Sequence, residues 1–134
     1  MIFVTVGTQK FQLNRLLELL DDEEIDEEIF AQIGFSTYRP NNFESRKFLS
    51  SKEFESYIQK SSLVITHAGV GSILTAMKYD KPILVFPRLK KYGEHVDDHQ
   101  LQIAETFTEK KYVKMYTEKK SLIKQINDSK KYET

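Results

Sequence analysis

No cysteine occurs in this chain of 134 residues, and its 20 basic residues balance 20 acidic ones, so the net charge is zero. The lack of cysteine excludes disulfide bonds and cysteine-ligated metal sites, and it is compatible with a cytosolic protein. The lack of net charge leaves the domain without the electrostatic footprint of a nucleic-acid-binding protein. No nucleic-acid partner is therefore expected.

Long apolar runs are missing as well. No run approaches the roughly 18 apolar residues that a membrane-spanning helix needs, and the first residues do not have the pattern of a signal peptide. Any association with a membrane is therefore expected to involve a partner or a surface. The length, together with the absence of repeats and low-complexity stretches, predicts one domain over residues 1–134.

Short apolar runs alternate with segments of helical periodicity along the whole chain. Strands are predicted at residues 2–6, 28–33, 47–50, 63–66, 82–87 and 112–116, helices at about 9–20, 54–60, 70–77, 101–107 and 122–126, and a loop at 36–46. Apolar runs without alternation are typical of strands buried on both faces of a parallel sheet. The order of elements predicts an α/β fold, with a Rossmann-like, doubly wound parallel sheet.

The motif THAGVGS (residues 66–72) directly follows the apolar run at 63–65. A helix that begins at such a turn gathers free backbone N–H groups and the positive end of its dipole at one point, which favours a phosphate. Gly69 and Gly71 let the backbone approach a ligand closely, Ser72 adds a hydroxyl, and His67 adds a titratable group. Alternatively, the glycines only make the turn and Ser72 caps the helix.

The same motif departs from three common signatures. The lysine of a P-loop and the third glycine of the dinucleotide fingerprint are absent, and Ser72 follows the second glycine, whereas the serine of a nucleophile elbow lies between two glycines. The predicted ligand is therefore a phosphorylated small molecule bound in another way.

A second motif, GEHVDDHQ (residues 93–100), follows the next predicted strand. Asp97 and Gln100 have the spacing of a capping box, which is the structural alternative to a binding role. His95 and His99 have a spacing that can bind zinc on a helix, but two ligands do not make a site and Val96 replaces the usual glutamate. No metal site is predicted.

Basic residues precede this motif on the same connection, namely Arg88, Lys90 and Lys91. They can balance a diphosphate, or the two lysines simply keep the surface charged. In a parallel sheet, ligands bind outside the carboxyl ends of the strands. Because Gly7, Thr8 and both motifs follow predicted strands, we expect them to converge at that edge.

Three stretches of the chain resemble the C-terminal, nucleotide-sugar-binding half of the family 28 glycosyltransferases. They are VTVGT (4–8), HAGVGS (67–72) and the segment from PR to GEHVDDHQ (87–100), and the resemblance covers essentially the whole chain. Within the family, the chain looks most like small stand-alone PssE-like subunits of bacterial exopolysaccharide and capsule synthesis. These are similar to the catalytic subunit of the eukaryotic UDP-GlcNAc transferase that adds the second sugar to dolichol-linked chitobiose.

The resemblance implies the donor half of a GT-B enzyme. The implied activity is inverting hexosyl transfer from a UDP-sugar to a lipid-linked saccharide acceptor, without an obligatory cofactor or metal. Because the chain has no room for an acceptor domain, we expect a membrane-anchored, PssD-like partner subunit and a cytoplasmic location at the inner face of the membrane. The alternatives are a non-catalytic nucleotide-sugar-binding or regulatory subunit, and a UDP-sugar epimerase or hydrolase.

The resemblance also suggests roles for single residues. The glycine turn would hold the donor diphosphate, the first loop would face the acceptor, and His99 and Gln100 would contact sugar hydroxyls. Many relatives have a ribose-binding glutamate where this chain has Thr75, which cannot bridge two hydroxyls. The residues expected to bind substrate are Gly7, Thr8, His67, Ala68, Gly69, Val70, Gly71, Ser72, Thr75, Arg88, His99 and Gln100. The general base remains open between His67, Glu94 and His95.

Overall fold

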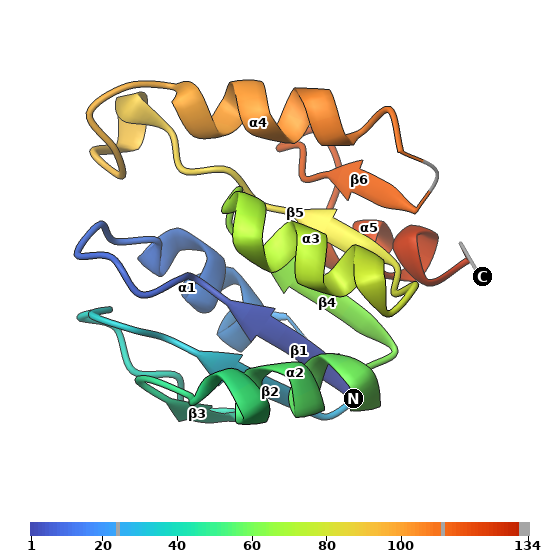
Figure 1. Ribbon diagram of the computed structural model, residues 1–134. Helices are drawn as coiled ribbons and strands as arrows, with labels where there is room; N and C mark the ends of the chain where they lie inside the picture. The colour runs from blue at the N-terminus through green and yellow to red at the C-terminus, as the bar shows by residue number, and fades with distance from the viewer. Residues whose placement is uncertain (24, 111, 132–134) are drawn as a thin grey trace.

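The computed structural model describes residues 1–23, 25–110 and 112–131, which form one six-stranded parallel sheet with helices on both faces (Figure 1). The elements are β1 (Ile2–Thr5), α1 (Asn14–Asp22), β2 (Ile29–Gln32), β3 (Glu44–Arg46), α2 (Ser51–Lys60), β4 (Leu63–Thr66), α3 (Val70–Lys78), β5 (Ile83–Val85), a 3₁₀ turn (Lys90–Tyr92), α4 (His99–Phe107), β6 (Val113–Met115) and α5 (Leu122–Lys130). In this described part, no helix combines the length and apolar character needed to cross a membrane.

The strand order is β3-β2-β1-β4-β5-β6, which is the order of the Rossmann fold. The sheet carries an apolar core on each face, because β1, β2, β4 and β5 are buried at every position. Helices α1 and α5 cover one face of the sheet, and α2, α3 and α4 cover the other (Figure 1). Ile2 and Val4 belong to the core under α1 and α5, whereas Phe3 and Val64 belong to the core under α2, α3 and α4. The predicted fold class is confirmed.

Helix α2 begins where the sequence provides a capping box. Ser50 Oγ accepts a hydrogen bond from the Glu53 backbone N–H at 3.1 Å, and Glu53 Oε1 accepts one from the Ser50 backbone N–H at 3.0 Å. Tyr57 then stacks on Phe30 with a centroid distance of 4.1 Å and on Phe3 with one of 5.7 Å, which fixes the helix on the sheet. The first turns of α2 therefore lie beside the carboxyl ends of the strands.

Two predicted boundaries are wrong. The third strand is Glu44–Arg46, inside the predicted loop and before residues 47–50. It is an edge strand with little burial, so its pairing with β2 is not visible as an apolar run. Helix α1 begins at Asn14 and not near residue 9, because the carbonyls of Phe11 and Gln12 accept hydrogen bonds from a distant arginine, Arg88.

Candidate functional site

The strand order reverses between β1 and β4, and the connections that follow these two strands open a pocket at the carboxyl edge of the sheet. The pocket has a volume of about 740 Å³. All the residues that the sequence predicts at the site line this pocket, apart from Arg88 and Glu94. The predicted convergence of the first loop, the glycine turn and the second motif therefore occurs.

The first turn of α3 forms one wall of the pocket. The N-cap is Gly69, and the first N–H groups of any helix have no acceptor within the helix. These groups and the positive end of the helix dipole make this wall attractive to an anion. A Cβ added at Gly71 would meet no described atom within 4 Å, so Gly71 leaves open space at this wall.

The other two glycines at the site make room for His67. A Cβ at Gly69 would come within 2.4 Å of the His67 Cε1, and a Cβ at Gly7 would come within 2.6 Å of its Nε2. Both distances are too short for a real contact, and Gly7 also has a positive φ of 83°. The imidazole therefore occupies the side of Gly69 that a Cβ would take, while Gly69 also lines the pocket, and its role in ligand binding stays a prediction.

His67 is held by two polar side chains. Its Nδ1 lies 2.9 Å from Arg88 Nη1 and 3.3 Å from Gln100 Nε2. Burial, reinforced by the positive charge of Arg88, lowers the pKa of His67 to about 3. The imidazole is therefore neutral near pH 7, and it does not itself bring a positive charge to the pocket.

Arg88 lies behind His67, whereas the sequence predicts it at the ligand surface. Its side chain is only 1% exposed, and its guanidinium donates to the carbonyl oxygens of Val6, Phe11 and Gln12. Burial lowers the pKa of Arg88 to about 10 against the opposing effect of Glu94, so Arg88 stays charged near neutral pH. The structure therefore does not support direct contact of Arg88 with a diphosphate in the pocket.

Glu94, one of the three candidate bases, is used elsewhere. Glu94 is 5% exposed, and its carboxylate accepts hydrogen bonds from Arg15 at 2.9 and 3.0 Å and from the Leu89 backbone N–H at 3.0 Å. Arg15 also packs over the rings of Phe86 and Tyr92, at 4.5 and 4.4 Å from the centroids. Glu94 therefore fixes the connection after β5 and does not face the pocket, which corrects its interpretation as a base.

His95 does line the pocket. Its ring packs on Phe11 with a centroid distance of 4.3 Å, and its Nδ1 lies 3.2 Å from Asp97 Oδ1. Asp97 also accepts a hydrogen bond from the backbone N–H of His99, the first residue of α4. The neighbouring carboxylate gives His95 an environment opposite to that of His67, which lies beside a cation.

Gln100 joins the two motifs. Its Oε1 accepts hydrogen bonds from the backbone N–H groups of Ala68 (3.3 Å) and Arg88 (3.0 Å), and its Nε2 faces His67. The capping-box interpretation of Asp97 and Gln100 is therefore wrong, because the amide is used in the buried network. One hydrogen of the Gln100 amide can still reach the pocket that this residue lines.

Thr75 also lines the pocket, but its hydroxyl donates to the Gly71 carbonyl at 2.9 Å. It can therefore serve a ligand hydroxyl only as an acceptor. Sequence reasoning missed the contribution of α2, from which Ser51, Phe54 and Glu55 reach the same pocket. The capping box at the start of this helix is the signal that could have placed these residues near the carboxyl edge.

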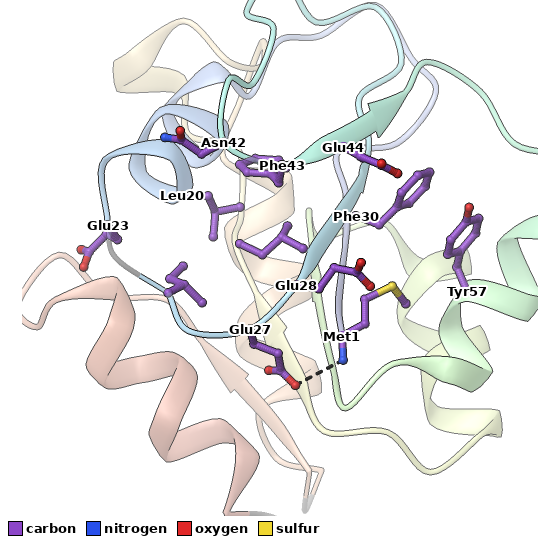
Figure 2. Close-up of a pocket in the computed structure, with 12 residues that line it drawn as sticks. Met1, Leu20, Glu23, Glu27, Glu28, Phe30, Asn42, Phe43, Glu44 and Tyr57 are labelled. Atoms are coloured by element: carbon purple, nitrogen blue, oxygen red, sulfur yellow. Dashed lines mark hydrogen bonds and ion pairs between the residues drawn. The ribbon is translucent and has the colours of Figure 1, made fainter.

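Among the residues that the structure describes, no three histidine, aspartate or glutamate side chains cluster so that they could hold a metal ion. A second pocket, of about 420 Å³, lies at the opposite, amino edge of the sheet (Figure 2). Glu23, Glu27, Glu28 and Glu44 line it, and the amino group of Met1 lies 3.2 Å from Glu27. Its carboxylates disfavour an anionic ligand, so the carboxyl-edge pocket is the better phosphate site.

The comparisons with known proteins agree with this geometry. Residues 1–134 match the glycosyltransferase family 28 C-terminal domain. The UDP-N-acetylglucosamine transferase subunit ALG13 of Candida albicans is 31% identical over 133 residues, which cover 95% of this chain and 42% of the relative. Human ALG13 is 32% identical over 114 residues, which cover 77% of this chain and 10% of the relative.

A solved structure gives the same fold. The glycotransferase of kitacinnamycin aligns with a TM-score of 0.61 and 16% identity, over 96% of this chain and 33% of its own. This chain therefore spans less than half the length of each of these relatives. Because the family match extends over the whole sequence, the chain belongs to the family 28 glycosyltransferase C-terminal domains and has the Rossmann-like fold of one half of a GT-B enzyme.

Proposed function

We propose that this domain binds a UDP-sugar in its carboxyl-edge pocket and is the donor-binding, catalytic subunit of a two-component inverting hexosyltransferase. The observation that carries the proposal is the free first turn of α3 at the point where the strand order reverses. The names of the relatives, which describe UDP-N-acetylglucosamine transferase subunits, support this donor class and a second subunit. UDP-GlcNAc is the first donor to test.

In this mechanism, an acceptor hydroxyl attacks the anomeric carbon of the sugar, and UDP leaves from the opposite face. The first turn of α3 stabilises the negative charge that develops on the leaving diphosphate. Binding the sugar between Gln100 and the glycine turn orients the donor for attack. A general base has to take the proton from the acceptor, and His95 is the candidate whose ring lines the pocket beside a carboxylate.

The acceptor belongs to the second part of this proposal. We place it on a lipid-linked saccharide in exopolysaccharide or capsule synthesis, presented by a membrane-anchored, PssD-like subunit. The domain then works in the cytoplasm, at the inner face of the membrane. Support for a second subunit comes from the names of the relatives, which are transferase subunits.

Calorimetric titration of the purified chain with UDP and UDP-GlcNAc tests donor binding. We expect binding in the micromolar to millimolar range, and its loss in Gly71→Val, because the new side chain fills the open space at the first turn of α3. Gln59→Val is the matched control, since it adds the same side chain to an exposed position of α2 away from the pocket. Equal affinity of both variants would contradict the assignment of the pocket.

A second experiment separates catalysis from simple binding. The chain is combined with a candidate membrane subunit, and UDP release is measured with and without a lipid-linked acceptor. A catalytic donor subunit gives acceptor-dependent release that His95→Gln lowers more strongly than it lowers donor affinity. Release without any acceptor would indicate a hydrolase, and donor binding without turnover in the reconstituted complex would indicate a non-catalytic subunit.

A further inference from the structure

The two ring nitrogens of His67 face different surroundings. A guanidinium can only donate hydrogen bonds, so the contact of 2.9 Å from Arg88 Nη1 requires an acceptor at Nδ1. The contacts of Gln100 lead to the same conclusion. Its Oε1 accepts hydrogen bonds from two backbone N–H groups, so its amide NH₂ is the end that faces Nδ1. With two donors at Nδ1, the neutral ring carries its proton at Nε2.

The protonated nitrogen lies on the ligand side. Nε2 is the atom that a Cβ at Gly7 would approach most closely, and it lies equally near the position of a Cβ at Gly69. It is therefore located between the first loop and the glycine turn, where His67 lines the pocket. A ligand at the first turn of α3 would meet an N–H donor here, and not a lone pair.

We propose that Arg88 is a positioning residue that fixes His67 in the Nε2–H tautomer, so that the neutral imidazole donates a hydrogen bond to the donor diphosphate. The identity of this ligand rests on the proposed function, whereas the tautomer does not. A hydrogen bond from a charged guanidinium to Nδ1 also polarises the ring and strengthens the Nε2–H donor. Arg88 thereby acts on the ligand through His67.

Arg88 is anchored well enough for this role. Its Nε and Nη2 groups donate to the carbonyls of Val6, Phe11 and Gln12, which leaves Nη1 directed at the imidazole. Because the three carbonyls belong to the backbone, the guanidinium cannot turn away without breaking these bonds. The same contacts exclude His67 as the general base, since one nitrogen is engaged and the other is already protonated.

Nitrogen-15 NMR of histidine side chains in the full chain tests the proposal without a ligand. Comparison with His67→Gln assigns the signals. We expect a pyridine-like Nδ1 and a pyrrole-like Nε2 at His67, unchanged from pH 8 to pH 5. Titratable or charged groups that face this region are Arg88, Glu94, Glu55, His95 and His99; the signals of His95 and His99 are followed separately, so their titration does not affect the result.

Two variants test the role of Arg88. In Arg88→Met we expect a mixture of tautomers, titration of His67 closer to its ordinary pKa, and about 10- to 100-fold weaker UDP-GlcNAc binding, as for the loss of a charge-assisted hydrogen bond. Arg88→Lys keeps one charged donor and should restore part of the tautomer preference and of the affinity. Arg15→Met is the matched control, because Arg15 contacts Glu94 and does not contact His67.

The outcomes separate this proposal from the proposed function. A pyrrole-like Nδ1 in the wild-type chain would overturn it, even if Arg88→Met fails to fold. An unchanged His67 spectrum in a folded Arg88→Met variant would overturn it as well. If the tautomer is as expected but UDP-GlcNAc does not bind to the wild-type chain, the assignment of the ligand is wrong. The assignment of Arg88 as the residue that fixes the His67 tautomer then still holds.

Discussion

The two edges of the sheet carry pockets of opposite character. The carboxyl-edge pocket combines the first turn of α3 with a charged arginine behind a neutral histidine. The amino-edge pocket is lined by four glutamates, and one of them, Glu27, pairs with the Met1 amino group (Figure 2). Glu27 also pairs with Lys130. In a chain with zero net charge, the two pockets thus differ in their local charge.

The difference has a physical origin in the parallel topology. Every strand except β2 is followed by a helix whose N-terminus starts near the carboxyl edge, so free N–H groups collect there. Carbonyl ends of helices point toward the amino edge, and acidic side chains add to this polarity. The two pockets differ in size, at about 740 and 420 Å³, and in the sign of the ligand charge that they favour. Charge and hydrogen-bonding capacity identify the carboxyl-edge pocket as the phosphate site.

The largest expected effect comes from removing the buried cation at the carboxyl edge. Arg88→Met leaves three backbone carbonyls without the guanidinium donor and leaves the His67 Nδ1 with Gln100 as its remaining donor. We expect a loss of about 3–5 kcal/mol in the free energy of unfolding, measured by urea denaturation. Lys130→Met, which removes a partly exposed cation from Glu27 at the amino edge, should cost less than about 1 kcal/mol. Equal losses would contradict the contrast between the edges.

Alanine substitutions at the two glycines of the turn should differ in their effect on stability. Gly69→Ala brings a Cβ within 2.4 Å of the His67 ring and should cost about 1–3 kcal/mol of stability. Gly71→Ala meets open space on a helix, and we expect it to be neutral or to stabilise the fold by up to about 1 kcal/mol. Thermal unfolding of both variants checks this pair. A larger loss for Gly71→Ala would mean that the roles of the two glycines are reversed.

His67 should give the carboxyl edge a pH dependence. Its pKa falls from 6.5 to about 3 on folding, so the unfolded chain binds a proton that the folded chain does not. Stability is therefore complete above pH 6.5 and decreases as the pH falls toward 3, by at most about 1.4 kcal/mol per pH unit. Glu27, whose pKa is lowered from 4.5 to about 2, adds a loss in the same direction only below pH 4.5.

Urea denaturation between pH 4.5 and 6.5 therefore isolates His67 from Glu27. The slope of stability against pH should flatten in His67→Gln and stay unchanged in Glu27→Gln. An unchanged slope in His67→Gln would mean that this histidine titrates normally in the folded chain.

The smallest effect is expected on ligand affinity when carboxylates at the amino edge are substituted. Glu28→Gln and Glu44→Gln change two exposed carboxylates of that pocket, at the opposite edge of the sheet from the first turn of α3. Screening at physiological salt makes the influence of such distant charges small, so UDP-GlcNAc affinity should change less than about twofold. A strong effect in titration calorimetry would move the binding site to the amino edge.

Local sequence predicted the fold and most of the pocket wall, because each of the patterns used for these predictions is a short, continuous stretch of the chain. The apolar runs at β1, β4 and β5 and the turn at residues 66–72 each lie within a few residues. The exceptions depend on long-range contacts. Arg88 meets carbonyls 76, 77 and 82 residues away, and Glu94 meets Arg15 79 residues away. Both charged side chains therefore looked like free surface groups.

The close packing of Gly69 against the His67 ring was not predicted, for a related reason. A glycine in a turn can leave room for a ligand or for a neighbouring side chain, and only the position of the His67 ring decides between the two. The edge strand β3 escaped detection because its burial is too low to leave a periodic pattern. In both cases the decisive contact, with the His67 ring or with β2, is set by the three-dimensional fold and not by the pattern of neighbouring residues.

The single guanidinium of Arg88 has a consequence for engineering this domain. It connects the loop after β1, through Val6, Phe11 and Gln12, with the histidine after β4, while its own backbone follows β5. The loops that follow β1, β4 and β5 are therefore not interchangeable modules. A chimera that imports the glycine turn of a relative has to import the matching residue after β5 and a compatible first loop, or the transplanted histidine arrives without the group that orients it.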